Sequence, residues 1–429
     1  MKETGKISRR SVLKAAAGVA GASMLGGVAR AQQSQVHQSP FLLGPARGNR
    51  VVIVGGGWGG VTTARTLKKL NPKIDVVLIE AKEIFMSCPL SNLYLAGLKD
   101  LHFFTFDYAN LVKEGIHFVN ERALDVDRDR KRVYTTGGTI AYDYLVLSPG
   151  IEYVYDEVPG FEPYRAYMPV GFRPFEHVAL RRNLEQFKGG DFIISVPKGP
   201  YRCPPGPYER AAMIAWYFKE HKIPGKVILV APASKPPKAK GFLAAYDDLY
   251  ADYLEYYPNT ETTGVDYERK VVHTSLGEFE FEQANVIPPM RAGEIVRKAG
   301  VGERWVDVEL PWHQTKVDPD VYVLGDADSA GGPKSGKLAF EEGRYRVAVH
   351  IAARIAGTEA ELKIPDVRNI CYSFVDDEDA IWIAARYNFD EVNKRRKALE
   401  SKLDTNRSPK NGKLAYAWAA EHWGYMFGS

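Results

Sequence analysis

The sequence lacks several features that would mark other classes of protein. The nine histidines show no metal-ligand spacing, and no Cys-x-x-Cys-His haem motif occurs. We therefore expect no metal site, and any haem would have to come from another chain. Repeats at the periods of solenoid proteins are also missing. The mild apolar stretch from Ala15 to Val28 is rich in Ala and Gly and shorter than the roughly 20 apolar residues of a membrane span.

The N-terminal segment predicts export rather than part of the fold. Ser8-Arg9-Arg10-Ser11-Val12-Leu13-Lys14 is a twin-arginine pattern, and Ala29-Arg30-Ala31 offers a small-x-small cleavage site. We expect residues 1–31 to be a signal peptide that sends the folded protein to the periplasm. They hold six of the 57 Lys and Arg residues and one of the 53 Asp and Glu, so the remainder has a net charge of −1. No basic field remains to attract nucleic acid.

A dinucleotide-binding pattern follows at once. The β-branched run from Arg50 to Val54 leads into Gly-Gly-Gly-Trp-Gly-Gly, then a helical pattern, and then a second strand that ends in Glu80. In this arrangement Gly55 makes a tight turn, Gly57 admits a pyrophosphate, and Gly60 lets the helix pack on the strand. Glu80 is placed to accept hydrogen bonds from a ribose.

Two later strands distinguish between FAD and NAD. The run Tyr142–Gly150 ends in Ser-Pro-Gly, with Ser148 and Gly150, and the run Val321–Asp326 ends in Gly-Asp, with Gly325 and Asp326. Such strands resemble those of flavoproteins with two dinucleotide-type domains, in which the second acid contacts the FAD ribityl chain. The resemblance indicates FAD.

A second βαβ outline has an unusual first turn. Strand-like residues 191–196 precede YRCPPGPYER, a helical pattern from Arg210 to His221, and another strand at 226–230. Prolines stand where a pyrophosphate loop needs backbone N–H groups, and proline has none. We therefore expect no NAD(P)H, and a rigid turn that holds Cys203 near the flavin, where it can carry sulfur.

Several motifs together resemble the flavoprotein subunit of flavocytochrome c sulfide dehydrogenase, a relative of the sulfide:quinone oxidoreductases. The resemblance runs through nearly the whole chain after residue 31. Its motifs are GGGWGG (55–60), SCPLSN (87–92), RCPPGPYER (202–210), IPPMRAG (287–293), GDAD (325–328), PKSG (333–336), NICYS (369–373) and AYAWAAEHWGYMFG (415–428).

The resemblance implies a periplasmic FAD-dependent oxidoreductase that oxidises sulfide or a related reduced-sulfur donor and passes electrons to a c-type cytochrome subunit. It also implies a covalent 8α-thioether between the flavin and Cys88. The residues agree with this, because a thiol about eight residues after Glu80 can reach the far end of the cofactor.

One position departs from the expected pattern. The resemblance implies a second redox cysteine just after the Gly-Asp strand end, and Asp328 stands there. Cys371 is the other available thiol, and we expect it to be a packed structural residue, with a Cys203–Cys371 bridge as the alternative. Three interpretations follow: direct attack of sulfide on the flavin with Cys203 holding the product, Asp328 as a general base beside a lone thiol, or a covalent-flavin dehydrogenase of a non-sulfur substrate. A catalytically silent FAD-binding electron-transfer subunit is a further alternative.

The predicted fold class is α/β, with a Rossmann-like FAD-binding domain in two segments, an inserted βαβ-type domain and a C-terminal α+β domain. The expected limits are 1–31 for the signal, 32–48 for a linker, 49–155 and 285–358 for the FAD domain, 156–284 for the inserted domain with Cys203, and 359–429 for a C-terminal domain that docks a partner. Within the last, residues 386–413 contain a charged helix-like run and a loop. The aromatic tail from Tyr416 to Phe427 is too apolar to lie free.

Overall fold

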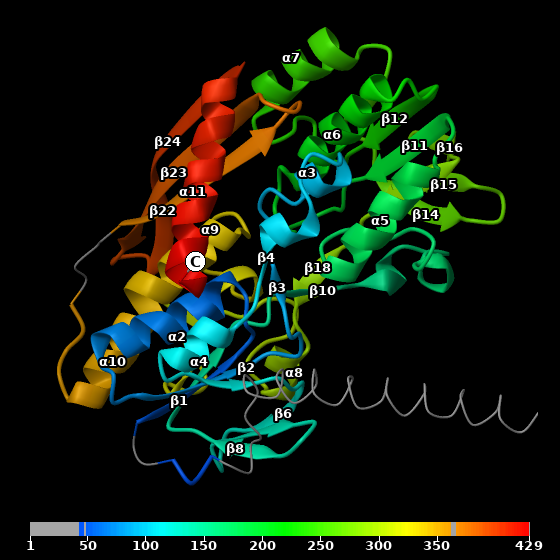
Figure 1. The fold of residues 1–429 in the computed structure, drawn as a ribbon. Helices are drawn as coiled ribbons and strands as arrows, with labels where there is room; N and C mark the ends of the chain where they lie inside the picture. Colours follow the sequence, from blue (N-terminus) through cyan, green and yellow to red (C-terminus); the bar gives the residue numbers. More distant parts are fainter. Residues whose placement is uncertain (1–42, 47–48, 362–365, 429) are drawn as a thin grey trace, which may run out of the picture.

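A computed structural model describes residues 43–46, 49–361 and 366–428. The predicted signal, residues 1–31, and most of the predicted linker, 32–48, lie outside the described residues. The structure is mixed α/β, as expected, with a mixed seven-stranded sheet, a parallel four-stranded sheet and an antiparallel three-stranded sheet near the C-terminus, besides smaller antiparallel sheets (Figure 1). Among its described helices, none combines the length and apolarity that a membrane span requires.

The first sheet carries the predicted dinucleotide unit. Its strand order is β19-β20-β21-β9-β1-β2-β5, and β1 lies between β9 and β2 with both neighbours parallel to it. All five residues of β1 are buried, as expected for a Val- and Ile-rich strand covered on both faces. The strands of this sheet are β1 (Arg50–Val54), β2 (Asp75–Ile79), β5 (His117–Val119), β9 (Tyr144–Leu147), β19 (Val308–Glu309), β20 (Gln314–Thr315) and β21 (Val321–Val323).

Helices and short hairpins surround this sheet. Helix α2 begins at Trp58, within the glycine motif, and ends before Asn71-Pro72, as the pattern predicts. The helices are α2 (Trp58–Leu70), α4 (Ala109–Lys113), α8 (Ile295–Lys298), α9 (Gly336–Glu342), the π-helical turn η6 (Gly343–Val347) and α10 (Ala348–Ala356). Helix α3 (Asn92–Leu95), from the same stretch of chain, packs instead on the inserted domain. The short strands are β3 (Phe85–Met86), β4 (Thr105–Phe106), β6 (Ala123–Asp127), β7 (Arg132–Thr135) and β8 (Thr139–Ala141), and the 3₁₀ turns are η2 (Leu101–Phe104) and η5 (Gly325–Ala327).

The second sheet lies in the chain between the two stretches that form the first. Its order is β13-β12-β11-β17, all parallel, and an antiparallel pair, β10 with β18, carries the chain into and out of it. In chain order, the elements of this inserted region are β10 (Ile151–Tyr153), η3 (Tyr155–Glu157), η4 (Glu162–Tyr164), α5 (Pro174–Gln186), β11 (Gly190–Ser195), α6 (Gly206–Glu220), β12 (Gly225–Val230), α7 (Ala239–Tyr250), β13 (Leu254–Tyr257), β14 (Thr262–Asp266), β15 (Val271–Thr274), β16 (Gly277–Glu280), β17 (Gln283–Val286) and β18 (Met290–Ala292).

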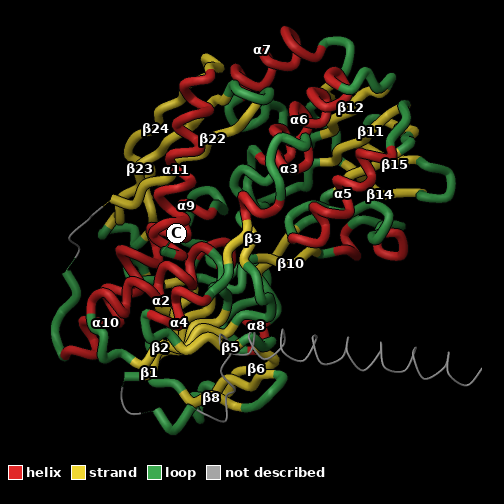
Figure 2. The backbone as a smooth tube through the Cα atoms, in the orientation of Figure 1, coloured by secondary structure: helices red, strands yellow, loops and turns green. Residues whose placement is uncertain are grey.

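The C-terminal region is a three-stranded antiparallel sheet and one long helix, visible beside each other in Figures 1 and 2. It contains β22 (Asp366–Phe374), β23 (Ala380–Asp390), β24 (Arg395–Ser408) and α11 (Pro409–Phe427). The helix-like interpretation of residues 386–413 is therefore wrong for most of that run. Pairing of β24 with β23 from Asp390–Arg395 to Ala380–Ser408 outweighs the local helix preference of its Lys, Arg and Glu residues.

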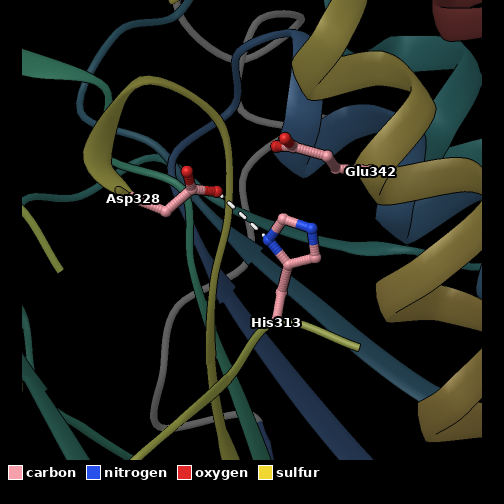
Figure 3. Close-up of side chains that lie close together, drawn as sticks. All are labelled: His313, Asp328 and Glu342. Carbon is pink, nitrogen blue, oxygen red and sulfur yellow. Dashed lines mark hydrogen bonds and ion pairs between the residues drawn. The ribbon is translucent and has the colours of Figure 1, made fainter. Parts of the chain in front are cut away.

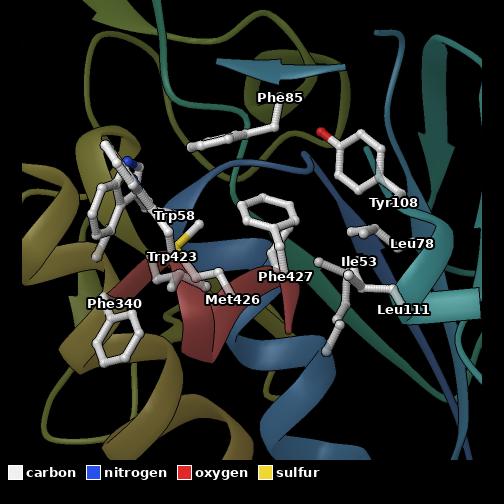
Figure 4. Packing of buried hydrophobic residues seen from close by; sticks show 14 of the residues in the cluster. Ile53, Trp58, Leu78, Phe85, Tyr108, Leu111, Phe340, Trp423, Met426 and Phe427 are labelled. Atoms are coloured by element: carbon white, nitrogen blue, oxygen red, sulfur yellow. The ribbon is translucent and has the colours of Figure 1, made fainter. Parts of the chain in front are cut away.

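The aromatic tail completes the core of the first domain. Phe427 packs against Phe85, Phe106 and Tyr108, and Trp423 and Met426 lie in the same buried cluster (Figure 4). The side chain of Arg65 in α2 binds the backbone carbonyl of Gly424 and thereby holds the end of α11. The tail is thus buried within this chain.

Candidate functional site

A cavity of about 1100 Å³ is lined by residues of all three parts of the molecule. The glycine loop, the turn that carries Cys88, the loop before α6 and strand β22 each contribute to its wall. Of the predicted cofactor-binding residues, Gly60 alone does not line it; the others are Gly55, Gly57, Glu80, Cys88, Ser148, Gly150, Gly325 and Asp326.

The glycine loop has the geometry that its spacing predicted. Gly55 has a positive φ of +109°, and a Cβ there would lie 2.2 Å from the carbonyl oxygen of Ser148. A Cβ on Gly60 would lie 1.9 Å from the carbonyl oxygen of Gly55, so the helix packs closely on the turn. A Cβ on Gly57 would meet no described atom within 4 Å, which leaves the backbone open to a ligand at the start of α2.

Glu80 closes one end of this loop. Its Oε2 accepts a hydrogen bond of 2.7 Å from the Gly56 N–H, and its Oε1 accepts one of 3.0 Å from the Lys82 N–H. The carboxylate therefore lies at the carboxyl end of β2, beside the turn that would receive the phosphates.

The residues present fit a flavin dinucleotide. Asp326 lies at the carboxyl end of β21, and its Oδ2 accepts a hydrogen bond of 2.6 Å from Arg202 Nε. Its Oδ1 and the Trp58 Nε1 are buried and have no hydrogen-bond partner among the described residues, and both side chains line the cavity. Buried polar atoms of this kind are normally satisfied, so they are suited to hydroxyl and carbonyl groups of a bound cofactor.

Three thiols meet at the cavity wall. The Cys203 thiol lies close enough to both Cys88 and Cys371 to interact with each, and all three are free thiols. Cys203 has a positive φ of +54°, an uncommon conformation for a residue other than glycine. Its N–H donates to the Lys334 carbonyl at 2.8 Å, and its carbonyl accepts from the Gly206 N–H at 2.7 Å. The proline turn therefore fixes Cys203 between its two neighbours.

The surroundings shift the pKa values of the three thiols in different directions. The hydrogen bond from Cys203 and the positive charge of Lys238 outweigh burial and lower the pKa of Cys371 to about 6. The hydrogen bond from Cys203, together with Arg202, also lowers the pKa of Cys88. Hydrogen bonds to Cys371 and Cys88, added to burial, raise the pKa of Cys203. The surroundings thus favour the thiolate at Cys371 and at Cys88 and the protonated thiol at Cys203.

Glu209 is a buried carboxyl on the same wall, in the first turn of α6. Its Oε1 accepts a 2.9 Å hydrogen bond from the Phe374 N–H, and its Oε2 accepts one of 3.1 Å from Asn92 Nδ2. Burial raises the pKa of Glu209 to about 7, against the opposing influence of Lys238 and the Phe374 N–H. The carboxyl can therefore take up or release a proton near neutral pH.

The structure places Asp328 away from this cavity, which differs from our expectation of a base beside the thiol. Its Oδ2 lies 3.1 Å from His313 Nδ1, and its Oδ1 accepts a 2.9 Å hydrogen bond from the Ala330 N–H (Figure 3). The carboxyl points from the end of the 325–327 turn toward β20 and α9, because the chain turns back after Asp326. Cys371, expected to be a packed structural residue, instead faces Cys203.

The ligand atoms of His313, Asp328 and Glu342 lie within 4.8 Å of one another, a spacing that a metal ion could use. Arg396 of β24 already supplies positive charge there, since its Nη2 lies 2.8 Å from Glu342 Oε1 and 3.3 Å from His313 Nε2. Glu342 Oε2 in turn accepts a 2.8 Å hydrogen bond from the Gly325 N–H. The group is thus a buried ionic network that supports the Gly325-Asp326 turn.

Sequence reasoning did not select Arg202, Glu209 or Lys238 as functional residues. Arg202 and Glu209 lie within the quoted motif YRCPPGPYER, so the motif was the available signal. Nothing in the local pattern around Lys238 marks it, because its role depends on a strand more than a hundred residues later in the chain.

Comparison with known protein families agrees with this geometry. The model for the central part of the "Sulfide dehydrogenase [flavocytochrome c] flavoprotein chain" matches residues 177–288, and a flavocytochrome c sulphide dehydrogenase flavin-binding model matches residues 363–427. A pyridine nucleotide-disulphide oxidoreductase model matches residues 49–175. The two flavocytochrome models thus cover the regions that contain Cys203 and Cys371.

Individual relatives lead to the same family. The flavoprotein chain of the flavocytochrome c sulfide dehydrogenase of Chlorobaculum thiosulfatiphilum is 58% identical over 43 residues, which are 10% of this chain and 90% of that sequence. The mitochondrial sulfide:quinone oxidoreductase of Mus musculus is 24% identical over 303 residues, which span 64% of this chain and 65% of the mouse protein's length.

A solved structure shows the same fold. The sulfide:quinone oxidoreductase of Aquifex aeolicus superposes with a TM-score of 0.73 at 20% identity and covers 89% of this chain and 92% of its own. A flavin cofactor agrees with the matched models and with the cavity described above. The chain belongs to the flavocytochrome c sulfide dehydrogenase flavoprotein family, within the wider group of flavin-dependent oxidoreductases that includes the sulfide:quinone oxidoreductases.

Proposed function

We propose that this protein is a periplasmic FAD-dependent oxidoreductase that oxidises sulfide or a related reduced-sulfur donor and passes the electrons to a c-type cytochrome. The observation that carries the proposal is that Cys203 and Cys371 line the same wall of the flavin-sized cavity, where their thiols interact. Two thiols in contact can alternate between a dithiol and a disulfide, and a disulfide accepts a sulfur nucleophile. Cys371 thus provides the second redox thiol in this proposal, in place of the position that Asp328 occupies.

The chain's own residues provide the proton chemistry of this step. Sulfide loses a proton when its sulfur is oxidised, and the Glu209 carboxyl is a buried acceptor on the same wall as both cysteines. Its hydrogen bonds to the Phe374 N–H and Asn92 fix its position without using up both lone pairs of each oxygen. We assign Glu209 the role of taking that proton.

Cys88 is the proposed attachment point of the flavin. It lines the cavity, and the pKa of its thiol is lowered by Cys203 and by Arg202, so that the nucleophilic thiolate is favoured. When bound, the flavin supplies a two-electron acceptor that can release electrons singly. Asp326, Ser148 and the glycine loop would hold it.

NAD(P)H is not part of the proposal. At the start of α6, Pro205 and Pro207 lack N–H groups, the Gly206 N–H binds the Cys203 carbonyl, and the Glu209 N–H binds the Pro205 carbonyl. A pyrophosphate at this helix would therefore find few free donors. The backbone groups at the start of α6 instead hold the conformation of Cys203.

The partner and the compartment are proposals of the same kind. The family name points to a cytochrome subunit, and the flavoprotein chain of the Chlorobaculum thiosulfatiphilum flavocytochrome is 58% identical to this chain over 43 residues. The periplasmic location depends on the Arg9-Arg10 pattern, which lies outside the described residues. Fractionation of cells that express the full chain, with an Arg9→Lys/Arg10→Lys variant as the control, tests it.

The experiment that tests the proposed function is an anaerobic titration of the purified protein with sulfide, followed by flavin absorbance. Sulfide should bleach the flavin, whereas NADH in a parallel titration should leave it oxidised. Bleaching by NADH with no response to sulfide would overturn the proposal. Addition of oxidised cytochrome c after bleaching then shows whether the electrons leave one at a time.

A further inference from the structure

Lys238 is a buried cation that lies behind Cys371, outside the residues that line the cavity. Its side chain is 3% exposed, and its ammonium group donates to Ser373 Oγ at 2.6 Å and to the Cys371 carbonyl at 3.2 Å. Both acceptors belong to β22, whereas Lys238 precedes α7 in the inserted domain. A single side chain thus joins two domains at the reactive thiol.

The backbone at this point is also unusual. Lys238 has φ +60° and ψ 34°, in the left-handed region that side-chain-bearing residues rarely adopt. A residue other than glycine in this conformation costs energy and persists where the surroundings require it. Here Lys238 is the N-cap of α7, and its side chain reaches β22.

We propose that Lys238 is a positioning residue that makes Cys371 the leaving group when sulfide opens a Cys203–Cys371 disulfide. In this step the HS⁻ sulfur bonds to Cys203 Sγ, the bond between the two cysteine sulfurs breaks, and its electron pair leaves on Cys371 Sγ. The products are a persulfide on Cys203 and a thiolate on Cys371. No other oxidant or reductant enters the step, since the disulfide is reduced as the sulfide sulfur is oxidised.

The choice between the two sulfurs follows from the groups around them. A disulfide opens faster toward the thiol that is the more stable anion. Cys371 is faced by Lys238 from the loop before α7, by Cys203 from the loop before α6, and by Glu209 from α6. Lys238 is the cation in this set, so the charge that develops on Cys371 is stabilised, and sulfide is directed to Cys203. The inference rests on the proposed function, because it assumes that the pair cycles through a disulfide.

The first test needs no sulfide and so separates this inference from the function. The reduced holoprotein is alkylated with iodoacetamide across a pH series, and the label on the Cys371 peptide is measured by mass spectrometry. We expect a midpoint near pH 6 in the parent protein and an upward shift of about one unit or more in Lys238→Met. Lys238→Arg should keep the parent midpoint. An unchanged midpoint in Lys238→Met overturns the proposal.

Two further variants guard against loss of the fold. Lys238→Gln keeps hydrogen-bond donors for Ser373 and the Cys371 carbonyl but removes the charge, and it should shift the midpoint as Lys238→Met does. Lys240→Met removes an exposed lysine in the first turn of α7, two residues after Lys238, and should leave the midpoint unchanged. If Lys238→Gln instead keeps the parent midpoint, the charge has no role and the proposal fails.

The second test locates the sulfur. One equivalent of sulfide is added to the oxidised protein, the free thiols are blocked, and the extra sulfur is assigned to a peptide. We expect it on Cys203 in the parent protein and on both cysteines in Lys238→Gln. Extra sulfur mainly on Cys371 in the parent would overturn the inference, whereas no extra sulfur on either peptide and no bleaching of the flavin would overturn the proposed function.

Discussion

Arg202 Nε donates a hydrogen bond of 2.6 Å to Asp326 Oδ2, across 124 residues of chain. The pair joins the loop that holds Cys203 to the turn at the end of β21. Arg202 also adds a positive charge beside Cys88. One ion pair therefore links the proposed flavin-binding acid, the turn proposed to carry sulfur and the proposed attachment cysteine.

Replacing Arg202 should loosen the cofactor. Arg202→Met leaves Asp326, which is 9% exposed, without its partner. Loss of one member of a buried pair costs about 3 kcal/mol, since the remaining charge stays buried. We expect a lower unfolding midpoint in urea and a lower ratio of flavin to protein. The control is Arg304→Met, which breaks the exposed pair with Glu157 and should cost less than about 1 kcal/mol. Equal losses in both variants would contradict the assigned role.

Cys88 and Cys371 should separate flavin attachment from sulfur chemistry. Cys88→Ser should release the flavin on acid precipitation, because serine offers no thiolate for the thioether. Cys371→Ser should keep the flavin bound to the pellet but lose most of the bleaching by sulfide, since the pair can no longer form a disulfide. The flavin absorbance of pellet and supernatant, measured beside the sulfide titration, checks both. Full bleaching in Cys371→Ser would favour direct attack on the flavin.

The sequence allowed the dinucleotide unit to be predicted well, because its information is local. The strand from Arg50 to Val54, the glycines and Glu80 lie within about thirty residues, and each has a steric or hydrogen-bonding reason. The partner of Cys203 could not be found in this way. Cys371 reaches it from β22 by tertiary packing alone, and an expectation tied to one position beside Asp326 selected Asp328 instead.

The same difference between local sequence information and tertiary packing explains why the helix-like interpretation of residues 386–413 is wrong for most of that run. Half of the residues of β24 are charged, and their local preference is helical, but pairing to β23 and a buried partner for Arg396 hold them extended. Tail burial was predictable, since Trp423 and Phe427 are too apolar for solvent. The surface that these side chains cover could not be predicted from the sequence, because it depends on tertiary packing.

Asp328 should matter for stability more than for turnover. Asp328→Asn removes the charge that faces His313 and Arg396, and we expect a loss of about 2–3 kcal/mol in unfolding free energy. Sulfide should still bleach the flavin, because the side chain does not line the cavity. Burial opposes ionisation, but His313 and Arg396 lower the pKa of Asp328 below its ordinary value. Its stabilising contribution is thus present above the unfolded pKa of about 3.9 and is lost as the pH falls through the folded one.

An acid titration of unfolding compares the two proteins. The parent should lose more stability than Asp328→Asn as the pH falls below about 4. If Asp328→Asn also abolishes bleaching while its flavin content stays normal, a catalytic role for the carboxylate returns.

Because of Glu209, the free energy of unfolding should decrease as the pH rises from mildly acidic to neutral. The pKa of Glu209 in the folded protein, about 7, lies above its value in the unfolded chain. At pH values between the two, the folded protein therefore binds more protons than the unfolded chain. For such a group, stability decreases as the pH rises from about 4.5 through the folded pKa, by about 3 kcal/mol in total. Glu209→Gln has no carboxyl to ionise, and the fall should disappear. Urea unfolding at pH 5, 6, 7 and 8 measures this without any contribution from the ionisation of sulfide.

The same variant tests proton transfer. The substitution Glu209→Gln puts a neutral amide of similar shape in place of the carboxyl, so the variant should retain flavin while bleaching by sulfide slows by about 100-fold, the lower end of what a positioned base contributes. Glu220→Gln, at the exposed end of the same helix, is the matched control and should change neither measurement. If Glu209→Gln bleaches slowly but its unfolding has the same pH dependence as that of the parent, Glu209 is ionised throughout this pH range and orients Asn92 and Phe374. That result would remove the carboxyl from the proton pathway.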